Sequence, residues 1–249
     1  LKADKEHVKV KLKDECIKAE DYNCFEDILS ISSSAFTSLD SFKDGLYHIQ
    51  DLSAQIVCEI IKPETGETVF DTCSAPGGKS FTLAQIMMNK GKVVSSDIHE
   101  HRINLIRNGA NRLGIDIIDT KCYDMTEKDD LTEFADKVLC DVPCSGFGVI
   151  RKKPEIKYKQ LADIKNLPEA QYKILKNASK AVKTGGKLYY STCTLNPKEN
   201  CEVADRFINE HSNFRPCKIE LIGNIKRVME EKENQITITP FSGGSDGFF

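Results

Sequence analysis

The sequence predicts an α/β fold built on a parallel, doubly wound sheet. Two observations support this prediction. From about residue 47 onward, short apolar segments alternate with segments of helical spacing, which is typical of right-handed strand–helix–strand crossovers. Each strand segment is also followed by chemically functional residues. Because ligands of open parallel sheets bind beyond the carboxyl ends of the strands, these residues are expected to face one crevice.

The elements are expected in a regular order. Strands are predicted over residues 68–71, 92–97, 119–123, 137–141 and 187–191. Helices are predicted over residues 81–89, 100–113, 167–182 and 198–210, and a final β region over 236–249. Gly114 is the expected C-cap of the second helix, since glycine readily adopts the left-handed conformation. Gly185 and Gly186 are expected to stop the third helix, and Pro197 begins the fourth at its favoured first turn.

The first 45 residues are expected to form a small accessory subdomain, with the main domain over residues 46–249. They are polar and mixed, with an amphipathic helix predicted over 5–19 and a serine-rich stretch over 30–34. A chain of 249 residues suits one sizeable domain with a small appendage. Leu1 in place of Met predicts that the chain begins inside a longer protein, and a strand is expected to be cut at Phe249 or to continue beyond it.

Composition excludes several classes of protein. No apolar run approaches the roughly 20 residues of a membrane helix, and no secretory signal is present, so a cytoplasmic location without a membrane partner is expected. The ten cysteines contain no C-x-x-C pair, so no metal site is expected. The net charge of −3 does not indicate a nucleic-acid binder. A local basic cluster of Arg151, Lys152, Lys153, Lys157 and Lys159 is either a solvated face or a binding surface.

The turn after the first strand is a candidate nucleotide site. Gly77 and Gly78 allow a ligand to approach the backbone closely, and Asp97 ends the next strand twenty residues after Gly77. Nucleotide-binding α/β proteins place the acid that holds ribose hydroxyls there. The alternative is an ordinary turn with an ordinary helix cap. A P-loop is disfavoured, because Cys73 stands where its first glycine is needed and Pro76 lacks the N–H of a phosphate cradle.

Two cysteines follow the fourth and fifth strands, in the segments 141–146 and 191–195. If these strands are neighbours in the sheet, Cys144 and Cys193 lie close together. A loop cysteine near helix ends and a bound cation can have a lowered pKa and become a thiolate nucleophile. The remaining cysteines are expected to be small apolar residues without a role.

At these residues the sequence resembles the Sun-type RNA (cytosine-5) methyltransferases. The matching segments are 47–55, 71–79, 141–146, Thr192-Cys193, Asn196-Pro197, Glu199-Asn200 and 243–248. The resemblance covers about residues 45–249 and implies a Rossmann-like, S-adenosylmethionine-dependent methyltransferase fold. Residues 148–158 most resemble the bacterial subfamily that methylates small-subunit ribosomal RNA, methyltransferase B, although Tyr158 stands where that subfamily often has Trp. That subfamily usually has an N-terminal helical RNA-binding domain, which these residues do not include, so either the chain is expected to be a trimmed catalytic fragment or the subfamily assignment is wrong. Residues 1–45 are the expected remnant of the small RNA-binding subdomain that precedes the catalytic core.

The resemblance also implies the roles of site residues. Cys193 is the expected nucleophile, and Cys144 is expected to assist release of product. The expected cofactor-binding residues are Cys73, Ser74, Ala75, Pro76, Gly77, Gly78, Lys79, Asp97, Arg102, Asp124 and Asp141. Lys79 and Asp141 are also expected at the catalytic centre.

The chemistry of cytosine explains why a thiolate is needed. Its carbon 5 is a poor nucleophile, and thiolate addition at carbon 6 makes carbon 5 enamine-like. The ring N3 then needs a proton or hydrogen-bond donor, which Asp141 can supply if its pKa is raised. A base must later remove the carbon-5 proton, with Cys144 as a candidate helper. The target base must be unstacked, so single-stranded RNA is the expected partner, with Arg151, Lys152 and Lys153 on its phosphates.

Three alternatives stay open. The same chemistry could act on transfer RNA or another RNA. A methyltransferase for protein or small molecules would need no nucleophilic thiolate, so the two cysteines disfavour it. An inactive RNA-binding factor of ribosome assembly would keep the fold without the activity. The sequence indicates no obligate protein partner.

Overall fold

The structure, a computed structural model, describes residues 2–22, 25, 27–32, 35–220, 228–240 and 245–249. Its centre is a five-stranded sheet in which every neighbouring pair is parallel. In sheet order the strands are β5 (Ile118–Cys122), β4 (Lys92–Asp97), β3 (Thr68–Asp71), β6 (Ala135–Asp141) and β7 (Val182–Ser191). The predicted parallel α/β sheet is confirmed, and the strand order reverses at β3, where open sheets bind ligands.

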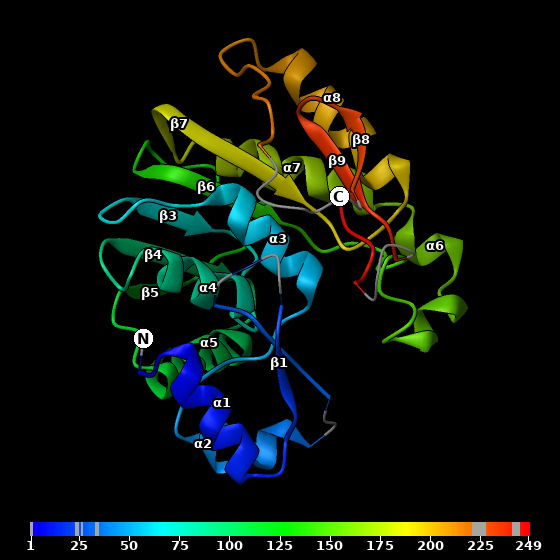
Figure 1. The fold of residues 1–249 in the computed structure, drawn as a ribbon. Helices are drawn as coiled ribbons and strands as arrows, with labels where there is room; N and C mark the ends of the chain where they lie inside the picture. The colour runs from blue at the N-terminus through cyan, green and yellow to red at the C-terminus, as the bar shows by residue number, and fades with distance from the viewer. Residues whose placement is uncertain (1, 23–24, 26, 33–34, 221–227, 241–244) are drawn as a thin grey trace.

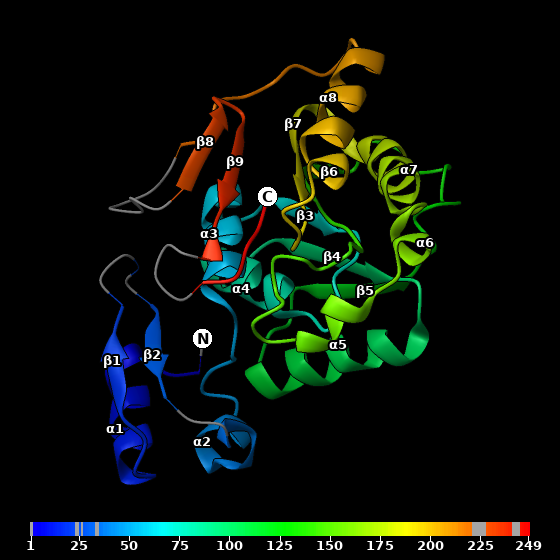
Figure 2. The same cartoon turned by 90° about the vertical axis from the view of Figure 1, so that its right-hand side faces the viewer.

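Helices cover both faces of this sheet (Figures 1 and 2). One face carries α3 (Leu52–Ile61), α4 (Gly78–Ile86) and α5 (Glu100–Leu113), and the other carries α7 (Leu167–Ser179) and α8 (Cys201–Glu210). Alternate strand residues separate the two cores: Val69 and Val93 pack with the first set, Phe70 and Val94 with the second. Because both faces are buried, the middle of the sheet contains consecutive apolar residues, Val69-Phe70 in β3 and Val138–Cys140 in β6.

The third helix ends earlier than predicted. α7 ends at Ser179, not 182, and Gly185 and Gly186 lie inside β7 rather than stopping the helix. Ala135 pairs with Val182 and Lys137 pairs with Lys187, so β7 carries extra residues opposite Asp136. Gly185 accommodates this irregularity with a φ of 82°. The pairing with β6 therefore recruits residue 182 into the sheet, which helical spacing alone does not reveal.

Other boundaries differ by a few residues. α4 begins at Gly78 instead of 81, and the strand expected at 119–123 spans Ile118–Cys122. The helix expected from residue 198 is divided into η3 (Pro197–Glu199) and α8, because Asn200 has φ −113° and ψ −103°. The final β region contains β9 (Gln235–Ile238), paired with an unexpected β8 (Val228–Lys232), and Phe248 bridges to Ile238. Gly243 and Gly244 of the matching C-terminal segment lie outside the described residues.

The N-terminal region contains α1 (Lys5–Asp14), the hairpin of β1 (Ala19–Asp21) and β2 (Leu29–Ile31), η1 (Phe36–Ser38) and α2 (Asp40–Lys43). α1 is shorter than predicted because Cys16 adopts a φ of 60°. Arg112 of α5 ties this region to the sheet domain: its guanidinium lies 3.9 Å from the centre of the Phe42 ring and donates to Tyr47 O at 3.0 Å. We propose residue 45 as the boundary of this subdomain.

Two further observations concern the described residues only. None of their helices combines the length and apolar character needed to cross a bilayer. Their nine cysteines are all free, and no group of three metal-ligand side chains forms among them.

Candidate functional site

The predicted site residues gather at the carboxyl edge of the sheet, where a series of contacts links the loops after successive strands. Tyr123 N, after β5, donates to Asp97 O of β4 at 3.1 Å. Ser74 N, after β3, donates to Ser96 O of β4 at 2.8 Å. Lys79 reaches Asp141 of β6, and Cys144 after β6 reaches Cys193 after β7. The strand ends therefore form one connected site rather than separate loops.

The glycine-containing turn is locked against β4. Ser74 Oγ donates to Ser96 O at 2.9 Å, and Ser96 Oγ donates to Thr72 O at 2.8 Å. Gly77 has a φ of 109°, and a Cβ at this position would lie 2.5 Å from Phe81 Cζ. Only glycine fits there without a shift of Phe81. The turn thus presents its backbone and the first turn of α4 in a defined position.

Asp97 is held by a neighbouring arginine. The Asp97 side chain is almost fully buried, and Arg102 Nη1 lies 3.0 Å from its Oδ2. Arg102 Nη2 donates to Ala75 O at 2.8 Å, so the guanidinium joins the acid to the turn. Ile98 follows the acid and is 49% exposed, although it is large and apolar. Sequence reasoning missed Ile98, and its apolar side chain beside a strand-end acid was the available signal.

Asp124 lies after β5 and forms a local turn. Its Oδ1 accepts from Thr126 N at 2.9 Å and from Thr126 Oγ1 at 2.7 Å. Tyr123, the residue before Asp124, donates its backbone N–H to Asp97 O.

Cys73, in the turn after β3, differs from these acids because burial raises the pKa of its thiol well above the usual range. Cys73 therefore fits a packing residue of the turn rather than a reactive thiol.

Lys79 and Asp141 form a largely buried ion pair. Lys79 Nζ lies 2.7 Å from Asp141 Oδ2, and the lysine side chain is 12% exposed. Burial opposes the ammonium form, but the charge and hydrogen bond of Asp141 outweigh it, so the pKa of Lys79 is raised. Lys79 Nζ also lies 5.1 Å from the centre of the Phe248 ring, a cation–π contact. The ammonium is thus retained in a site with little water.

A second buried acid lies behind this pair. Asp71 is fully buried, and burial raises its pKa to about 7 despite the hydrogen bond donated by Ser80. Its other oxygen, Oδ1, has no hydrogen-bond partner among the described residues. At neutral pH Asp71 is therefore partly protonated, and its ionised fraction adds to the effect of Asp141 in favouring the Lys79 ammonium.

Cys144 and Cys193 are in direct contact. Their Sγ atoms lie 2.9 Å apart, well beyond the roughly 2.05 Å of a disulfide, and both thiols are free. Cys193 N also donates to Cys144 Sγ at 3.3 Å. The hydrogen bond from Cys144 lowers the pKa of Cys193, against burial and the charge of Asp141, while the pKa of Cys144 is raised. Cys193 is therefore the more acidic thiol of this pair, and Cys144 is the one that keeps its proton more firmly.

Glu199 clamps the two cysteine loops together. Its side chain is fully buried, and its carboxylate accepts three hydrogen bonds: from Ser145 N at 2.8 Å, Gln171 Nε2 at 3.0 Å and Asn196 Nδ2 at 2.9 Å. Ser145 is the residue after Cys144, and Asn196 belongs to the loop of Cys193. The matching segment contained Glu199, but its role went unrecognised because its acceptor function depends on donors from three separate elements.

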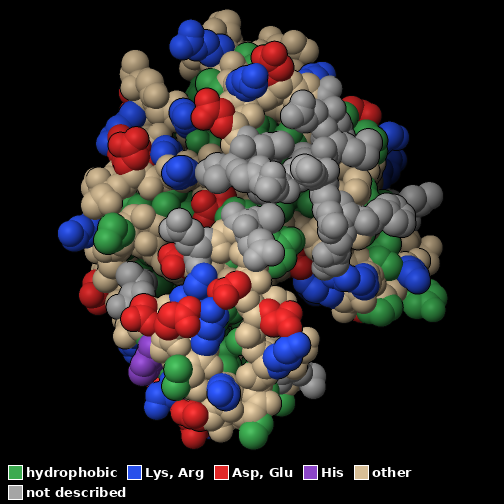
Figure 3. All heavy atoms as spheres, in the orientation of Figure 1, with side chains coloured by type: hydrophobic (Ala, Val, Ile, Leu, Met, Phe, Trp, Pro, Cys, Tyr) green, Lys and Arg blue, Asp and Glu red, His purple; other side chains and the backbone are tan. Residues whose placement is uncertain are grey.

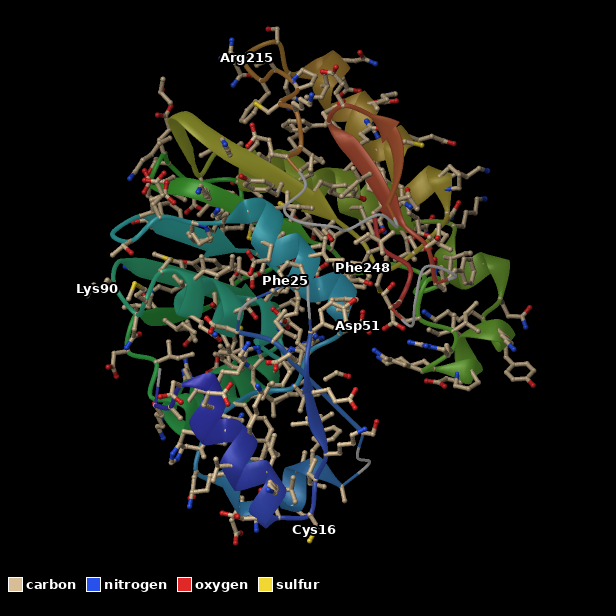
Figure 4. The ribbon with its side chains drawn as sticks, in the orientation of Figure 1. Cys16, Phe25, Asp51, Lys90, Arg215 and Phe248 are labelled. Carbon is tan, nitrogen blue, oxygen red and sulfur yellow. The ribbon has the colours of Figure 1, made fainter. Side chains whose placement is uncertain are left out.

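The C-terminal segment completes this edge. Phe249 and Thr192 exchange two backbone hydrogen bonds of 3.0 Å, and Gly247 N donates to Gly148 O at 2.8 Å. A Cβ on Gly148 would lie 2.0 Å from Gly247 O, so the two backbones can approach only at a glycine. Figure 4 shows Phe248 near Asp51 at the N-terminal end of α3. The last residues thus cover the site beside Cys193.

The basic cluster is only partly available to a ligand. Lys152 forms ion pairs with Asp51 and, at 2.9 Å, with Asp246, while Arg151 lies 3.8 Å from Asp246. Within the described part of the chain, Lys153 has no ion-pair partner. Lys152 is therefore paired with two carboxylates in this structure, and the contact of Lys152 with RNA phosphates stays a prediction. A cavity of about 400 Å³ between α5 and β5 includes none of the predicted site residues.

Comparisons with known proteins agree on one family. Residues 58–249 match the family model "16S rRNA methyltransferase RsmB/F". The chain is 39% identical to the probable ribosomal RNA small subunit methyltransferase B of Bacillus subtilis (strain 168), over 100% of this chain and 57% of that protein. The chain thus spans little more than half the length of this curated relative.

Solved structures show the same fold. The crystal structure of PH0851 has a TM-score of 0.92 at 29% identity, over 100% of this chain and 56% of that one. The structure of NSun6 from Pyrococcus horikoshii with SFG has a TM-score of 0.72 at 26% identity, over 89% of this chain and 57% of that one. The Rossmann-like fold of S-adenosylmethionine-dependent methyltransferases, expected from the sequence, is confirmed.

The cysteine contact predicts the reactivity of Cys193. In Cys144→Ala the hydrogen bond that lowers the pKa of Cys193 is lost, so that pKa rises and less thiolate is present at neutral pH. We expect alkylation of Cys193 by iodoacetamide near pH 7 to slow about tenfold, measured by mass spectrometry across pH 6–9. Cys16→Ala, far from the site, is the control. An unchanged pH profile in Cys144→Ala would contradict this origin of the thiolate.

The Glu199 clamp predicts a stability effect. In Glu199→Gln an amide replaces the carboxylate, so its N–H group faces donors and at least one buried donor loses its acceptor. We expect a loss of about 2–3 kcal/mol in the free energy of unfolding, measured by urea denaturation. Glu202→Gln, on the exposed side of α8, is the matched control. Equal unfolding midpoints for the two variants would show that Glu199 is not a clamp.

Proposed function

We propose that this chain, which belongs to the 16S rRNA methyltransferase RsmB/F family, transfers a methyl group from S-adenosylmethionine to carbon 5 of a cytosine in small-subunit ribosomal RNA. The observation that supports this chemistry most directly is the 2.9 Å contact between the Sγ atoms of Cys144 and Cys193. Methyl transfer to an oxygen or nitrogen needs no thiolate, whereas the weakly nucleophilic carbon 5 of cytosine does.

The residues at the carboxyl edge fit the proposed cofactor. The buried carboxylate of Asp97 suits ribose hydroxyls, and the adjacent exposed Ile98 offers an apolar surface to an adenine ring. The turn containing Ser74, Gly77 and Gly78 presents backbone groups beside the acid. SFG, present in the NSun6 structure, is an analogue of S-adenosylmethionine. When bound, S-adenosylmethionine supplies the electrophilic methyl group that carbon 5 receives.

Arg102 and Asp124 have distinct proposed roles. Arg102 holds Asp97 against Ala75 O, so we assign it to positioning of the acid and the turn. Asp124 lies at the end of β5, beyond Asp97, where a carboxylate can bind an exocyclic amino group. The other residues of the predicted set, Cys73, Ala75 and Pro76, give the turn its shape.

The first chemical step belongs to Cys193. The Cys193 thiolate adds to carbon 6. The carbon 5–carbon 6 double bond opens, and the electron pair of that bond moves to carbon 5 and into the ring. The Lys79–Asp141 pair lies beside the cysteines and can supply the hydrogen bonds that the ring N3 and its neighbouring amino group need. Sequence reasoning gave the donor role to Asp141 alone, and the ion pair adds the Lys79 ammonium as a donor.

Cys144 is proposed to assist the last step. After methylation a base removes the carbon-5 proton, the double bond re-forms, and the bond between carbon 6 and the Cys193 sulfur breaks. The electron pair of that bond returns to Cys193 as a thiolate. A protonated Cys144 at 2.9 Å stabilises this leaving thiolate by the same hydrogen bond that lowers its pKa in the resting protein.

Features beyond the site remain part of the proposal. Residues 1–45 are proposed as the remnant of an RNA-binding subdomain and residues 46–249 as the catalytic domain. The RNA target follows from the family rather than from this site, so transfer RNA or another RNA would use the same residues. The cytoplasmic location and the lack of an obligate protein partner stay predictions.

A trapping experiment tests the covalent mechanism. Cys144→Ala protein, mixed with unmodified small-subunit ribosomal RNA and S-adenosylmethionine, should accumulate an RNA complex that survives denaturation, since release is slowed. The complex is measured on a denaturing gel, with Cys193→Ala as the control that should give none. Absence of a complex, in protein shown to bind both the RNA and the cofactor, would reject the assigned roles of the two cysteines.

A binding experiment tests the cofactor site. Asp97→Ala should bind S-adenosylmethionine about 10- to 100-fold more weakly, equivalent to about 1.4–2.7 kcal/mol, because the ribose hydroxyls lose their acceptor. Isothermal titration calorimetry gives the dissociation constant. Asp130→Ala removes an exposed acid that is not among the proposed site residues and should change nothing. Equal affinity in the two variants would show that the cofactor binds elsewhere.

A further inference from the structure

We propose that Tyr158, flanked by Lys153 and Lys157, is a stacking platform for an unpaired RNA base next to the target cytosine. We call the segment from Lys153 to Lys159 the platform. It contains the short helix η2 (Pro154–Tyr158) and precedes α6 (Leu161–Ile164). This inference rests on the proposed function, since it identifies how the same site would hold the RNA around its target base.

The exposure of Tyr158 is unusual for its size. Tyr158 is 82% exposed, the highest exposed fraction of any large apolar residue in the described part of the chain. Exposure of an aromatic ring to water is unfavourable, and the ring offers a flat face on which a base can stack. Such stacking tolerates any base, because every base has a π-face. A ring in this position is therefore suited to a neighbouring nucleotide rather than to sequence readout.

The platform is nevertheless fixed to the catalytic loop. Ile156 is buried beneath it, and a Cβ added at Gly146 would lie 2.9 Å from Ile156 Cδ1. Lys159 Nζ donates to Ser145 O at 2.8 Å. Ser145 and Gly146 directly follow Cys144. Residues on either side of Tyr158 in sequence thus anchor the backbone that carries the ring to the loop that contacts Cys193.

Charge around the ring favours a polyanion. Lys153 and Lys157 are exposed, and neither has an ion-pair partner within the described part of the chain. By contrast, Lys152 is paired with Asp51 and Asp246. Figure 3 shows Lys and Arg side chains gathered at this edge of the molecule. Two such cations beside an exposed aromatic ring match a nucleotide strand, with its base on the ring and its phosphates on the lysines.

The place of Tyr158 fits a mechanism in which the target cytosine is unstacked from its neighbours. A cytosine that leaves its stack to reach Cys193 exposes the faces of its neighbours. A ring anchored to the Cys144 loop can replace one of these lost stacking contacts and hold the strand while the target base is in the site. Tyr158 therefore contributes to RNA binding and to orientation, and it makes no contact with the reacting atoms.

A stacking signal provides the direct test. The probe is a single-stranded RNA containing one cytosine with 2-aminopurine beside it, whose fluorescence is quenched by stacking. Wild-type protein and Tyr158→Phe should quench the probe, while Tyr158→Ala and Tyr158→Leu should not. By fluorescence anisotropy, the latter two should bind about tenfold more weakly, within the range of one lost base–aromatic contact. Placing 2-aminopurine on each side of the cytosine in turn identifies the stacked neighbour.

Matched variants separate base stacking from a general effect of surface apolarity or surface charge. Met88→Ala removes another exposed apolar side chain and should leave binding unchanged. Lys157→Ala should make the affinity less dependent on salt, lowering the slope of log K against log salt by about 0.7, whereas Lys43→Ala, already paired with Asp40, should not. Methylation by Tyr158→Ala at saturating RNA should stay within about twofold of wild type, with the loss confined to KM.

Results that contradict the Tyr158 platform differ from results that contradict the proposed methyltransferase function. Equal quenching and affinity in wild type and Tyr158→Ala would overturn the platform, even if wild-type protein methylates the RNA. Restoration of binding by Leu would also overturn it, because the exposed ring would then act as a hydrophobic contact, such as one with a protein partner. Failure of Cys144→Ala to trap RNA would instead count against the catalytic proposal, because quenching requires binding alone.

Discussion

The parallel pairing of β6 with β7 is the constraint on which this site depends. It aligns Asp141 with Ser191 at the edge of the sheet, so that the loops carrying Cys144 and Cys193 leave the sheet side by side. Pairing alone does not set a sulfur–sulfur distance of 2.9 Å. Glu199 adds this precision, because one buried carboxylate binds donors from both loops and from α7. The reactivity of Cys193 is thus a property of the pair of loops and not of one residue.

Electrostatics at the site follow from unequal burial of three charged groups. Asp141 keeps the Lys79 ammonium charged although that side chain is largely buried. Asp71, which is fully buried and has a pKa of about 7, adds to the stabilisation of that charge when it is ionised. The Lys79 cation favours the Cys193 thiolate, but the charge of Asp141 opposes it more strongly, so the hydrogen bond from Cys144 is the main cause of the lowered pKa of Cys193. The low local dielectric strengthens each of these interactions, so small shifts of the C-terminal segment that covers Lys79 would change all of them together.

The basic residues after β6 fall into two groups, those paired with carboxylates and those without an ion-pair partner in the described part of the chain. Lys152 joins Asp51 and Asp246, and so connects the start of α3 to the segment that carries Phe248. Lys153 and Lys157 form no such pair within the described residues and leave their charge to solvent or to a ligand. Residues that look alike in sequence thus differ in function because only some of them face carboxylates from distant parts of the chain.

The sequence by itself determined the five strands of the parallel sheet, the doubly wound order, the glycine-containing turn and the place of the two cysteines, because each is encoded locally by apolar periodicity or by a residue at a strand end. It misjudged the end of α7 and the place of Gly185, since the pairing of Val182 with Ala135 decides both. It also left Glu199 without a role and Lys152 without a partner. Those features depend on donors and acceptors that meet only after folding, and no local pattern specifies which distant group will face a given side chain.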